Sequence, residues 1–295
     1  MLLWLFAVNS TAAEIAVVKS KDIEPYNAAI SGFKKVIREN ISENNMDGDI
    51  KKGIAITDRL RTEKPNLVVS LGAEASYITS QNIKTIPVVF SMVTNPPRYN
   101  IGDGNVTGVR LDIPVKTQLG FYREILPDVR KIGIIYSDEG TKKFIDEARH
   151  LSAQYDMEIV SIGIKEMREL PQAVEKILSE SDSLWLLFDP LVTSSPRIVQ
   201  EVIIFKALQK KIPVVGFNKW SVTAGSLYCL YSEYEDIGRQ TGEMADRILR
   251  GENPSSIPIE SPRDVKILFN NKVLDRVVSK GRVNMPEKAY MWQGE

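Results

Sequence analysis

The chain has 295 residues, and its 38 Lys and Arg side chains balance 38 Asp and Glu side chains. This length favours two domains, each with its own core. The charge balance shows neither the basic excess typical of nucleic-acid binding nor an acidic tail, so a charged ligand must be met by local groups. With one histidine and one cysteine, a disulfide framework, a His-rich zinc site and a Cys-rich metal site are excluded.

The first residues predict an export signal. A short apolar run at 2–8 is followed by small residues that fit a cleavage site after Ala13. The run is far shorter than the roughly 20 residues needed to cross a bilayer, which argues against a permanent anchor. No Lys or Arg precedes it, so a buried strand or a start further upstream stays open. We expect residues 1–13 to be a signal peptide and the mature protein to be periplasmic or otherwise extracytoplasmic.

Strands and helices alternate along the first part of the chain. An apolar strand at 15–19 leads into a polar loop, and near-continuous apolar runs further on are typical of strands buried on both faces. The elements predicted after that strand are a helix at 26–39, a weak polar segment near Ile41, a helix at 50–64, a strand at 66–72, a helix from 74, a strand at 86–92 and a segment at 105–114. This series favours a mostly parallel sheet covered by helices.

The same alternation starts afresh at Val115, which indicates a second domain of similar architecture. Its predicted helices are at 115–126, 141–155, 170–180 and 195–211, and its predicted strands are at 131–137, 157–164, 183–188, 212–218 and 226–231. A helix at 234–251 follows, with acidic residues in its first turn and Gly251 at its end. Because no flexible linker separates the halves, we expect short crossovers near 112–114 and 231–234.

The motifs of common enzymes are missing. The chain has no phosphate-binding G-x-x-x-x-G-K-[ST] motif, and the Gly-rich segment at 102–108 lacks the spacing of a dinucleotide-binding loop. It has no G-x-S-x-G nucleophile motif, and its single histidine, His150, lies in the middle of a charged predicted helix. Cys229 reads as a small buried hydrophobe. We therefore expect a protein that is not an enzyme.

Polar or small residues recur just past the predicted strands, where α/β sheets present groups to ligands. Helices starting at Glu74 and Thr141 would direct free N–H groups suited to a carboxylate. Ordinary helix caps and turns would explain any one of these positions, but six on two domains favour a binding site. The positions are Asp22, 72–74, 94–96, 137–141, Asp189 and Asn218.

A series of stretches along the chain carries a family resemblance. In order, they are SKDIEPYNAAISGFK, PNLVVSLGAEAS, IPVVFSMVTNP, VTGVRLDIP, LPDVRKIGIIY, SLWLLFDPLVTS, KKIPVVGFN and YEDIGRQTGEMADRILRGENPSSIPIE. Together they resemble the ABC transporter substrate-binding proteins of the tryptophan/tyrosine-binding type. The likeness covers nearly all of the chain after the predicted signal.

The resemblance implies an α/β protein of the periplasmic-binding-protein type I fold, with two doubly wound Rossmann-like lobes joined by hinge strands. The N-terminal lobe would be 14–112 plus 232–260, and the C-terminal lobe 113–231 plus 261–295. Such a protein closes on a small ligand and delivers it to an ABC permease in the membrane. It implies a monomer that needs no cofactor or metal and binds no nucleic acid.

The resemblance also implies which residues contact the ligand. In the first lobe they are Asp22, Tyr26, Ala73, Glu74, Thr94 and Asn95, and in the second lobe Tyr136, Gly140, Thr141, Asp189 and Asn218. Asp189 would pair with an ammonium group and the helix start at Glu74 with a carboxylate. On this view, Asp189→Ala would weaken binding and leave the fold intact.

Three departures from the family pattern leave the ligand open between an aromatic amino acid and another amino-acid-like molecule. Asn95 stands where amino-acid-binding members often have Asp, Pro190 where they have Asn, and 140–141 reads Gly-Thr in place of Asn-Ser. Trp220 could supply a further aromatic face, although an aromatic residue next to a strand is more often part of the core.

Two other functions remain as alternatives. The same fold could serve as a sensory module that reports a ligand to a partner receptor or histidine kinase, although no kinase or transmembrane helix is recognisable in the chain. An enzyme on a similar scaffold lacks a nucleophile and a base. A sugar-binding transcription regulator would need an N-terminal helix-turn-helix, and the first strand begins too early for one.

Overall fold

The computed structural model describes residues 14–102, 104–277, 282–287 and 289–292. The chain divides into two units and passes between them three times. Unit 1 contains the residues up to Asp112 and the segment Glu233–Asp264, and unit 2 contains Ile113–Ser232 and the residues from Val265 onward. The export signal expected at residues 1–13 lies outside the described residues.

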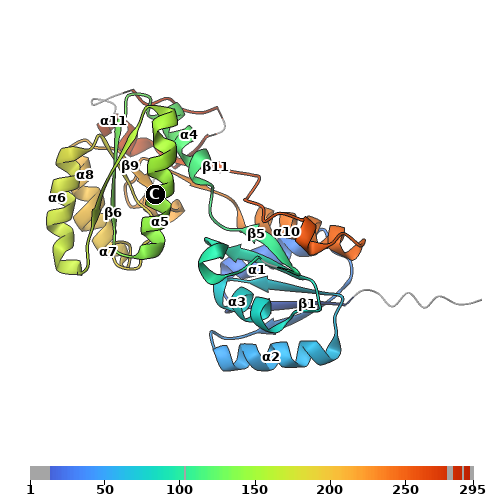
Figure 1. The fold of residues 1–295 in the computed structure, drawn as a ribbon. Helices are drawn as coiled ribbons and strands as arrows, with labels where there is room; N and C mark the ends of the chain where they lie inside the picture. The colour runs from blue at the N-terminus through green and yellow to red at the C-terminus, as the bar shows by residue number, and fades with distance from the viewer. Residues whose placement is uncertain (1–13, 103, 278–281, 288, 293–295) are drawn as a thin grey trace, which may run out of the picture. The chain divides into compact units, whose positions relative to one another are not determined.

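Unit 1 is built on a parallel sheet whose described strands have the order β2-β1-β3-β4-β5 (Figure 1). Each pair of neighbouring strands runs parallel, so the carboxyl ends of all these strands lie at one edge of the sheet. The elements are β1 (Glu14–Lys19), α1 (Glu24–Lys34), β2 (Asn40–Asn45), α2 (Ile50–Glu63), β3 (Leu67–Leu71), α3 (Ala73–Asn82), β4 (Val88–Val93), η1 (Pro96–Tyr99), β5 (Val106–Arg110), α10 (Tyr234–Leu249) and η5 (Pro254–Ser256).

The central strand β1 shows why this sheet needs helices on both faces. Ile15 and Val17 pack into a core shared with residues of α1 and α10. Ala16 and Val18 point the other way, into a core shared with residues of α2 and α3. Because both faces are buried, the middle of the strand, residues 15–18, is an unbroken apolar run, and the unit has the predicted doubly wound arrangement.

Helix α10 belongs to unit 1 because it packs closely on α1. Glycines on both helices allow the approach: a Cβ at Gly238 would overlap the carbonyl of Ala29, and one at Gly32 would overlap the carbonyl of Glu235. The chain returns from unit 2 just before α10. The loop after β1 leads into α1, and the second passage between the units leads into α10. Both connections therefore adjoin the same pair of packed helices.

Unit 2 is built on a larger sheet whose described strands have the order β12-β11-β10-β9-β8-β6-β7 (Figure 1). Strands β10 and β11 are antiparallel, and the other neighbours are parallel. The elements are α4 (Val115–Ile125), β6 (Lys131–Tyr136), α5 (Glu139–Ser152), η2 (Ala153–Tyr155), β7 (Glu158–Gly163), η3 (Met167–Glu169), α6 (Leu170–Glu180), β8 (Ser183–Trp185), α7 (Pro196–Ile198), η4 (Val199–Ile204), α8 (Phe205–Gln209), β9 (Val214–Gly216), α9 (Lys219–Thr223), β10 (Tyr228–Tyr231), β11 (Lys266–Asn270), α11 (Asn271–Val277) and β12 (Ala289–Trp292).

Strand β6 divides its side chains between two cores, as β1 does in unit 1. Ile132 and Ile134 pack with residues of α4 and α5. Ile135 packs on the opposite face with residues of α6 and the helix that follows β8. His150 is exposed on α5 and Cys229 is buried in β10, as the sequence indicated.

Several predicted element boundaries were wrong. The first helix ends at Lys34 rather than near Glu39, and the polar segment near Ile41 is the edge strand β2, which pairs with β1. The strand predicted at 183–188 is only Ser183–Trp185, and the helix predicted at 195–211 contains a π-helical turn. The pattern also missed the strands of the C-terminal segment, where β12 pairs in parallel with β11.

Candidate functional site

Each predicted site residue lies at the carboxyl end of a parallel strand, as Tyr136 does in β6, or in the loop or helix that follows such an end. They form two sets, one in each unit. Those in unit 1 lie after β1, β3 and β4, and those in unit 2 lie after β6, β8 and β9. Each set therefore occupies the edge of its sheet where open α/β proteins place ligands.

The loop after β1 is held by a buried lysine at the end of that strand. The Lys19 ammonium forms an ion pair with Asp22 at 2.9 Å and donates to the side chain of Asn27. Asp22 also accepts a hydrogen bond from Asn27. These contacts lower the pKa of the Asp22 carboxyl, with the hydrogen bond from Lys19 as the largest cause. The loop thus presents an ionised and solvent-exposed carboxylate at neutral pH.

The first turn of α3 is capped from a neighbouring strand rather than by its own cap residue. Gly72 precedes the helix and has no side chain to offer, so the Ala75 N–H donates to the Oγ of Ser20, at 2.9 Å. Ser20 is itself fixed because its hydroxyl donates to the carbonyl of Leu71. The amides of Ala73 and Glu74 lie on the same first turn, where a helix supplies no acceptor. This end of α3 is suited to an anionic group.

Tyr26 lies directly over this helix start. A Cβ at Gly72 would overlap the Tyr26 hydroxyl and would lie 2.8 Å from the Ser20 Oγ. Only glycine leaves room here, and its φ of +87° also favours glycine. Burial raises the pKa of Tyr26, and the negative charge of Glu74 raises it further. The phenol is therefore protonated at neutral pH and can donate a hydrogen bond.

The loop after β4 is set by an irregularity in that strand. The register with β5 shifts between Ser91 and Val93, and Met92 between them has a left-handed φ of 61°. Asn95 is also left-handed, and its N–H donates to Oδ1 of Asp112 at 2.9 Å. Bulges of this kind redirect a chain next to functional sites. Here the bulge precedes Thr94 and Asn95, and their loop is tied to Asp112, the last residue before the first passage into unit 2.

In unit 2, Asp189 is the most tightly held of the predicted residues. Its side chain is 1% exposed and accepts the backbone N–H and the hydroxyl of Ser137, at 2.8 and 2.6 Å. The N–H groups of Leu191 and Val192 also donate to it. Oδ1 accepts three of these hydrogen bonds and Oδ2 accepts one, so the carboxylate is buried and largely satisfied within unit 2. In this structure Asp189 joins the loops after β6 and β8.

The other predicted residues of unit 2 take part in local caps and packing. Thr141 is buried, and its N–H donates to the cap residue Asp138 of α5. The Asn218 side chain accepts the N–H of Ser221 in a capping box at the start of α9. Tyr136 packs across the sheet on Gly163, and Gly140 lies in the first turn of α5. These helix starts are capped by their own side chains, unlike the start of α3.

Two aromatic side chains at this edge were missed by the sequence analysis. Phe188 follows β8 and is exposed, and Phe217 follows β9 and is half-buried. Their ring centroids are 6.4 Å apart, in an edge-to-face arrangement. The predicted strands 183–188 and 212–218 included both residues, so neither was singled out as a candidate site residue. Because the strands stop at Trp185 and Gly216, the two rings lie beyond them.

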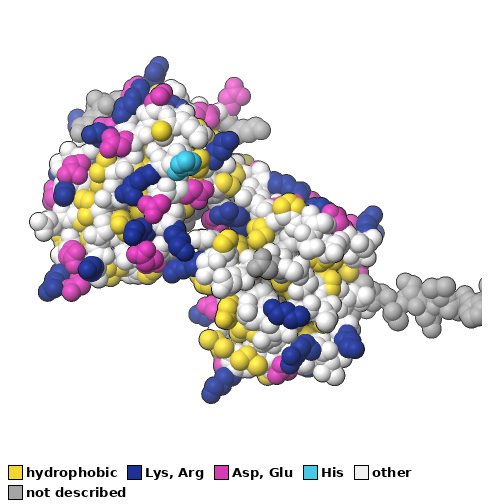
Figure 2. Space-filling view, in the orientation of Figure 1, with side chains coloured by type: hydrophobic (Ala, Val, Ile, Leu, Met, Phe, Trp, Pro, Cys, Tyr) yellow, Lys and Arg dark blue, Asp and Glu magenta, His cyan; other side chains and the backbone are white. Residues whose placement is uncertain are grey.

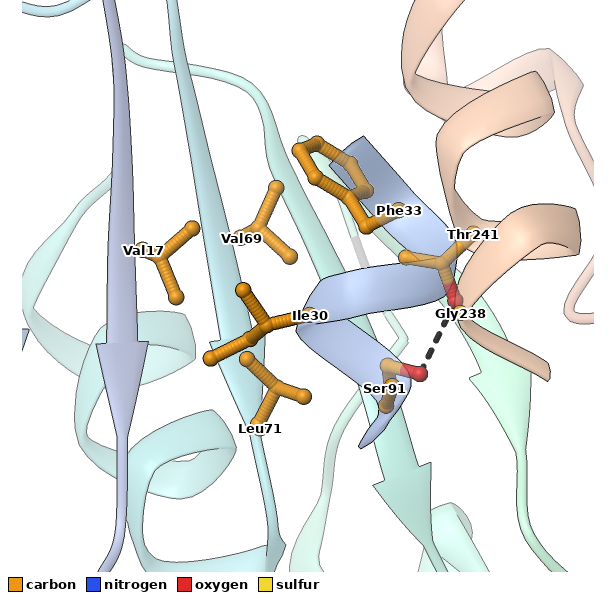
Figure 3. A pocket seen from close by; sticks show the side chains of 9 residues that line it. Val17, Ile30, Phe33, Val69, Leu71, Ser91, Gly238 and Thr241 are labelled. Atoms are coloured by element: carbon orange, nitrogen blue, oxygen red, sulfur yellow. Dashed lines mark hydrogen bonds between the residues drawn. The ribbon is translucent and has the colours of Figure 1, made fainter. Parts of the chain in front are cut away.

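A small cavity in unit 1 lies between one face of the sheet and the helices α1 and α10, and it is distinct from the candidate site at the strand ends. Figure 3 shows apolar side chains of β1, α1 and β3 around it, with Ser91 and Thr241 at one side. The hydroxyls of Ser91 and Thr241 hydrogen-bond each other at 2.8 Å, which leaves the remaining lining almost entirely apolar. The cavity is a packing gap between the sheet and the helices α1 and α10.

Other kinds of site find no support in the described part of the chain. No group of three or more His, Cys, Asp or Glu side chains there could hold a metal ion. Among the same residues, no helix is both long and apolar enough to cross a bilayer. On the face shown in Figure 2, basic and acidic side chains are interspersed rather than gathered by sign.

Comparison with known proteins identifies the family. A family model described as "ABC transporter substrate binding protein" matches residues 27–288, which is most of the chain. The chain belongs to this family. Members are solute-binding proteins, which are a non-enzymatic class.

Two relatives resemble this substrate-binding protein over most of their length. The tyrosine-binding protein of Clostridioides difficile (strain R20291) is 26% identical over 251 residues, which cover 82% of this chain and 72% of the relative. An uncharacterized protein of Rickettsia prowazekii (strain Madrid E) is 23% identical over 279 residues, covering 92% of this chain and 88% of the relative.

Solved structures confirm the fold. The ligand-free, open structure of a substrate-binding protein with adhesive properties from Clostridium difficile matches with a TM-score of 0.82 and 23% identity, over 96% of this chain and 100% of the other. A Streptococcus pneumoniae ABC domain in complex with L-Trp matches with a TM-score of 0.66 and 22% identity, over 95% and 99% of the two chains. The predicted class, two doubly wound lobes of the periplasmic-binding-protein type I fold, is confirmed.

Proposed function

We propose that this substrate-binding protein binds a small amino-acid-like ligand, with aromatic amino acids as the first candidates, and hands it to an ABC permease. The family membership supports a role in solute binding. One relative is named a tyrosine-binding protein, and one structural neighbour holds L-Trp. Periplasmic or other extracytoplasmic location, a cleaved signal at residues 1–13 and a monomeric state are part of the same proposal.

The observation that carries the proposal is the start of α3 in unit 1. The amides of Ala73 and Glu74, on a turn whose Ala75 amide is already satisfied by Ser20, suit the carboxylate that every free amino acid carries. The protonated phenol of Tyr26 is a further donor beside that turn. The exposed carboxylate of Asp22 is an acceptor for an ammonium group.

The proposed mechanism is hinge closure. The chain passes between the units three times, at 112–113, 232–233 and 264–265, and these passages would serve as the hinge. Contacts that the ligand makes with both units exist only in a closed state, so binding would shift the population toward closure. Residues of both sets would line the closed site, with Asp189, Thr141 and Asn218 positioning the unit 2 loops.

The test is a thermal-shift screen of the chain from Glu14 onward, after unfolding and refolding to remove ligand carried through purification. L-Tyr, L-Trp and L-Phe are compared with other amino acids, small acids and sugars. A ligand present at about a hundred times its dissociation constant adds about 2.7 kcal/mol of stability, which raises the unfolding midpoint by several degrees.

The screen separates the possible outcomes. A shift with an aromatic amino acid supports the proposal, and small-angle scattering of the same complex should then show a smaller radius of gyration than the free protein. A shift only with a sugar or another acid would contradict the amino-acid assignment and leave the transport role. No shift with any compound would contradict a free small-molecule ligand and favour the sensory or partner-binding alternative.

A further inference from the structure

The carboxyl edge of the unit 2 sheet carries an apolar side chain that packing does not explain. Phe188 is 75% exposed, more than any other large apolar side chain among the described residues. A single exposed phenylalanine on a surface would be ordinary. This one directly precedes Asp189, at the edge where the polar residues of the candidate site also lie.

Phe188 has an aromatic neighbour at the same edge. Phe217 follows β9, which pairs directly with β8, and the two rings meet edge to face with an interplanar angle of 62°. Trp220, three residues after Phe217, is half-buried, and both side chains pack against the same hydrophobic core of unit 2. Each of two adjacent strands is thus followed by a phenylalanine within three residues, and the more exposed ring faces solvent.

The backbone that carries both rings is fixed from each side. Asp189, next to Phe188, accepts four hydrogen bonds from Ser137, Leu191 and Val192. Asn218, next to Phe217, forms a reciprocal capping box with Ser221. A platform that is already ordered loses little entropy when a ligand binds to it, so exposed rings held in this way are suited to recognition.

We propose that Phe188 and Phe217 form the subsite for the aromatic ring of the ligand. The inference rests on the proposed function and deepens it: unit 2 reads the side chain of the ligand, and unit 1 reads its charged amino-acid groups. The unit 1 edge supplies helix amides, the Tyr26 hydroxyl and the Asp22 carboxylate. The ligand is therefore amphipathic, with a ring at one end and a polar group at the other.

Ring recognition has a physical advantage over simple burial. Aromatic pairs in edge-to-face or offset geometry are favourable beyond the area that they bury. A third ring placed against Phe188 would extend the existing edge-to-face pair. A ligand with a short aliphatic side chain gains no such contact, so this edge selects ring-bearing ligands over aliphatic ones of similar polarity.

The chain offers a matched control for the test. Phe205 lies in the same unit and is 58% exposed, but it is on helix α8 rather than at a strand end. Phe188→Ala, Phe217→Ala and Phe205→Ala are each compared with the unaltered chain by calorimetric titration with L-Tyr, L-Phe and L-Ala. Circular dichroism of each variant checks that the fold is retained. We expect Phe188→Ala to fold, because Phe188 is exposed.

We expect Phe188→Ala to weaken binding of L-Tyr and L-Phe about tenfold. Binding of any ringless amino acid that the chain accepts, such as L-Ala, should change less than about twofold. Phe205→Ala should leave all affinities unchanged. Phe188→Leu keeps an apolar side chain without a ring. Its affinity for the ring-bearing ligands should lie between that of the unaltered chain and that of Phe188→Ala.

The outcomes distinguish this inference from the proposed function. If the unaltered chain binds aromatic amino acids and Phe188→Ala binds them equally well, the ring subsite is refuted and the proposed function stands. Equal losses for L-Phe and L-Ala would also refute it, because the phenylalanine would then act on the shared part of the ligand. If the unaltered chain binds no aromatic amino acid, the aromatic assignment and the subsite both fail.

Discussion

The carboxyl edges of the two sheets are built on the same plan but differ in what they leave available. In unit 1, the start of α3 has no cap of its own, and a serine from the neighbouring strand satisfies only one amide of its first turn. In unit 2, α5 and α9 are capped by Asp138 and Asn218 from their own chain segments. Unit 1 thus offers polar groups to a ligand, whereas unit 2 satisfies its polar groups internally and offers aromatic rings.

The difference teaches that a polar residue past a strand end is not by itself a ligand contact. Asp22 and Asp189 occupy equivalent places in the sequence pattern, each just beyond a buried strand. Asp22 is exposed, whereas Asp189 is buried under four hydrogen bonds. The partners decide which role a carboxylate has, and the partners come from other loops.

The largest expected effect comes from removing the polar lock of unit 2. Asp189→Ala leaves the amides of Ser137, Leu191 and Val192 without their acceptor in a buried place, and we expect a loss of about 3 kcal/mol in the free energy of unfolding. This differs from the sequence-based expectation of an intact fold. Three tryptophans, Trp185, Trp220 and Trp292, lie in unit 2, so tryptophan fluorescence during urea unfolding measures the effect there.

Asp146→Ala is the control for that experiment. Asp146 is in the same unit, but it is exposed, and its ion pair is with the exposed Arg149 on its own helix. Such a pair contributes little, so its removal should cost less than about 0.5 kcal/mol. If the two variants lost the same stability, Asp189 would be a surface-like carboxylate free to contact a ligand, and the contrast between the two edges would fail.

A smaller effect is expected at the helix start of unit 1. Gly72→Ala would place a Cβ against the Tyr26 hydroxyl and the Ser20 Oγ, at a φ of +87°. We expect a loss of about 2 kcal/mol and a weakened affinity for an amino-acid ligand, because both side chains at the α3 start must move. Thermal unfolding and titration with L-Tyr measure the two effects.

Gly251→Ala separates strain from site geometry. Gly251 is in the same unit and has a φ of +102°, but a Cβ there would meet nothing within 4 Å. Its substitution should cost about 1 kcal/mol from backbone strain alone and leave ligand affinity unchanged. A loss of affinity in Gly251→Ala equal to that in Gly72→Ala would show that the α3 start has no special part in binding.

Much of the architecture could be predicted from the sequence because buried strands and helices show a local pattern of apolar residues. The runs that became β1, β3 and β4 are mostly apolar, since both faces of these strands are covered. Strand β2 could not be read in this way. Its residues, NISENN, are mostly polar, and it is a strand because its backbone pairs with β1 at the edge of the sheet.

The positions of the candidate residues near strand ends were predictable, but the partners of those residues were not. The strand ends identified the loops that carry Asp22, Glu74, Asp189 and Asn218, because helix starts and turns have local signals. Local signals do not tell which groups are satisfied from elsewhere. Ser20 caps α3 from more than fifty positions away in sequence. Phe188 was predicted as a strand residue because an apolar residue at the end of an apolar run continues the pattern, whereas it lies beyond β8 and is exposed.

The smallest expected effect, on the pH dependence of stability, tests the exposed carboxylate of unit 1. Hydrogen bonds from Lys19 and Asn27 lower the pKa of Asp22 from its ordinary value of 3.8. A depressed pKa contributes stability above the unfolded value, and this stability is lost as the pH falls through the lower folded value. Asp22→Asn should therefore unfold at a slightly lower temperature than the unaltered chain at pH 6, and the difference, measured by circular dichroism, should shrink steadily as the pH falls below 3.8 and through the lower folded value. A difference that persists unchanged into that acid range would mean that the carboxylate is not what Lys19 stabilises. The loop after β1 would then be held by Asn27 and α1 without the Lys19–Asp22 ion pair. The exposed Asp22 carboxylate would no longer support the contrast between the two units.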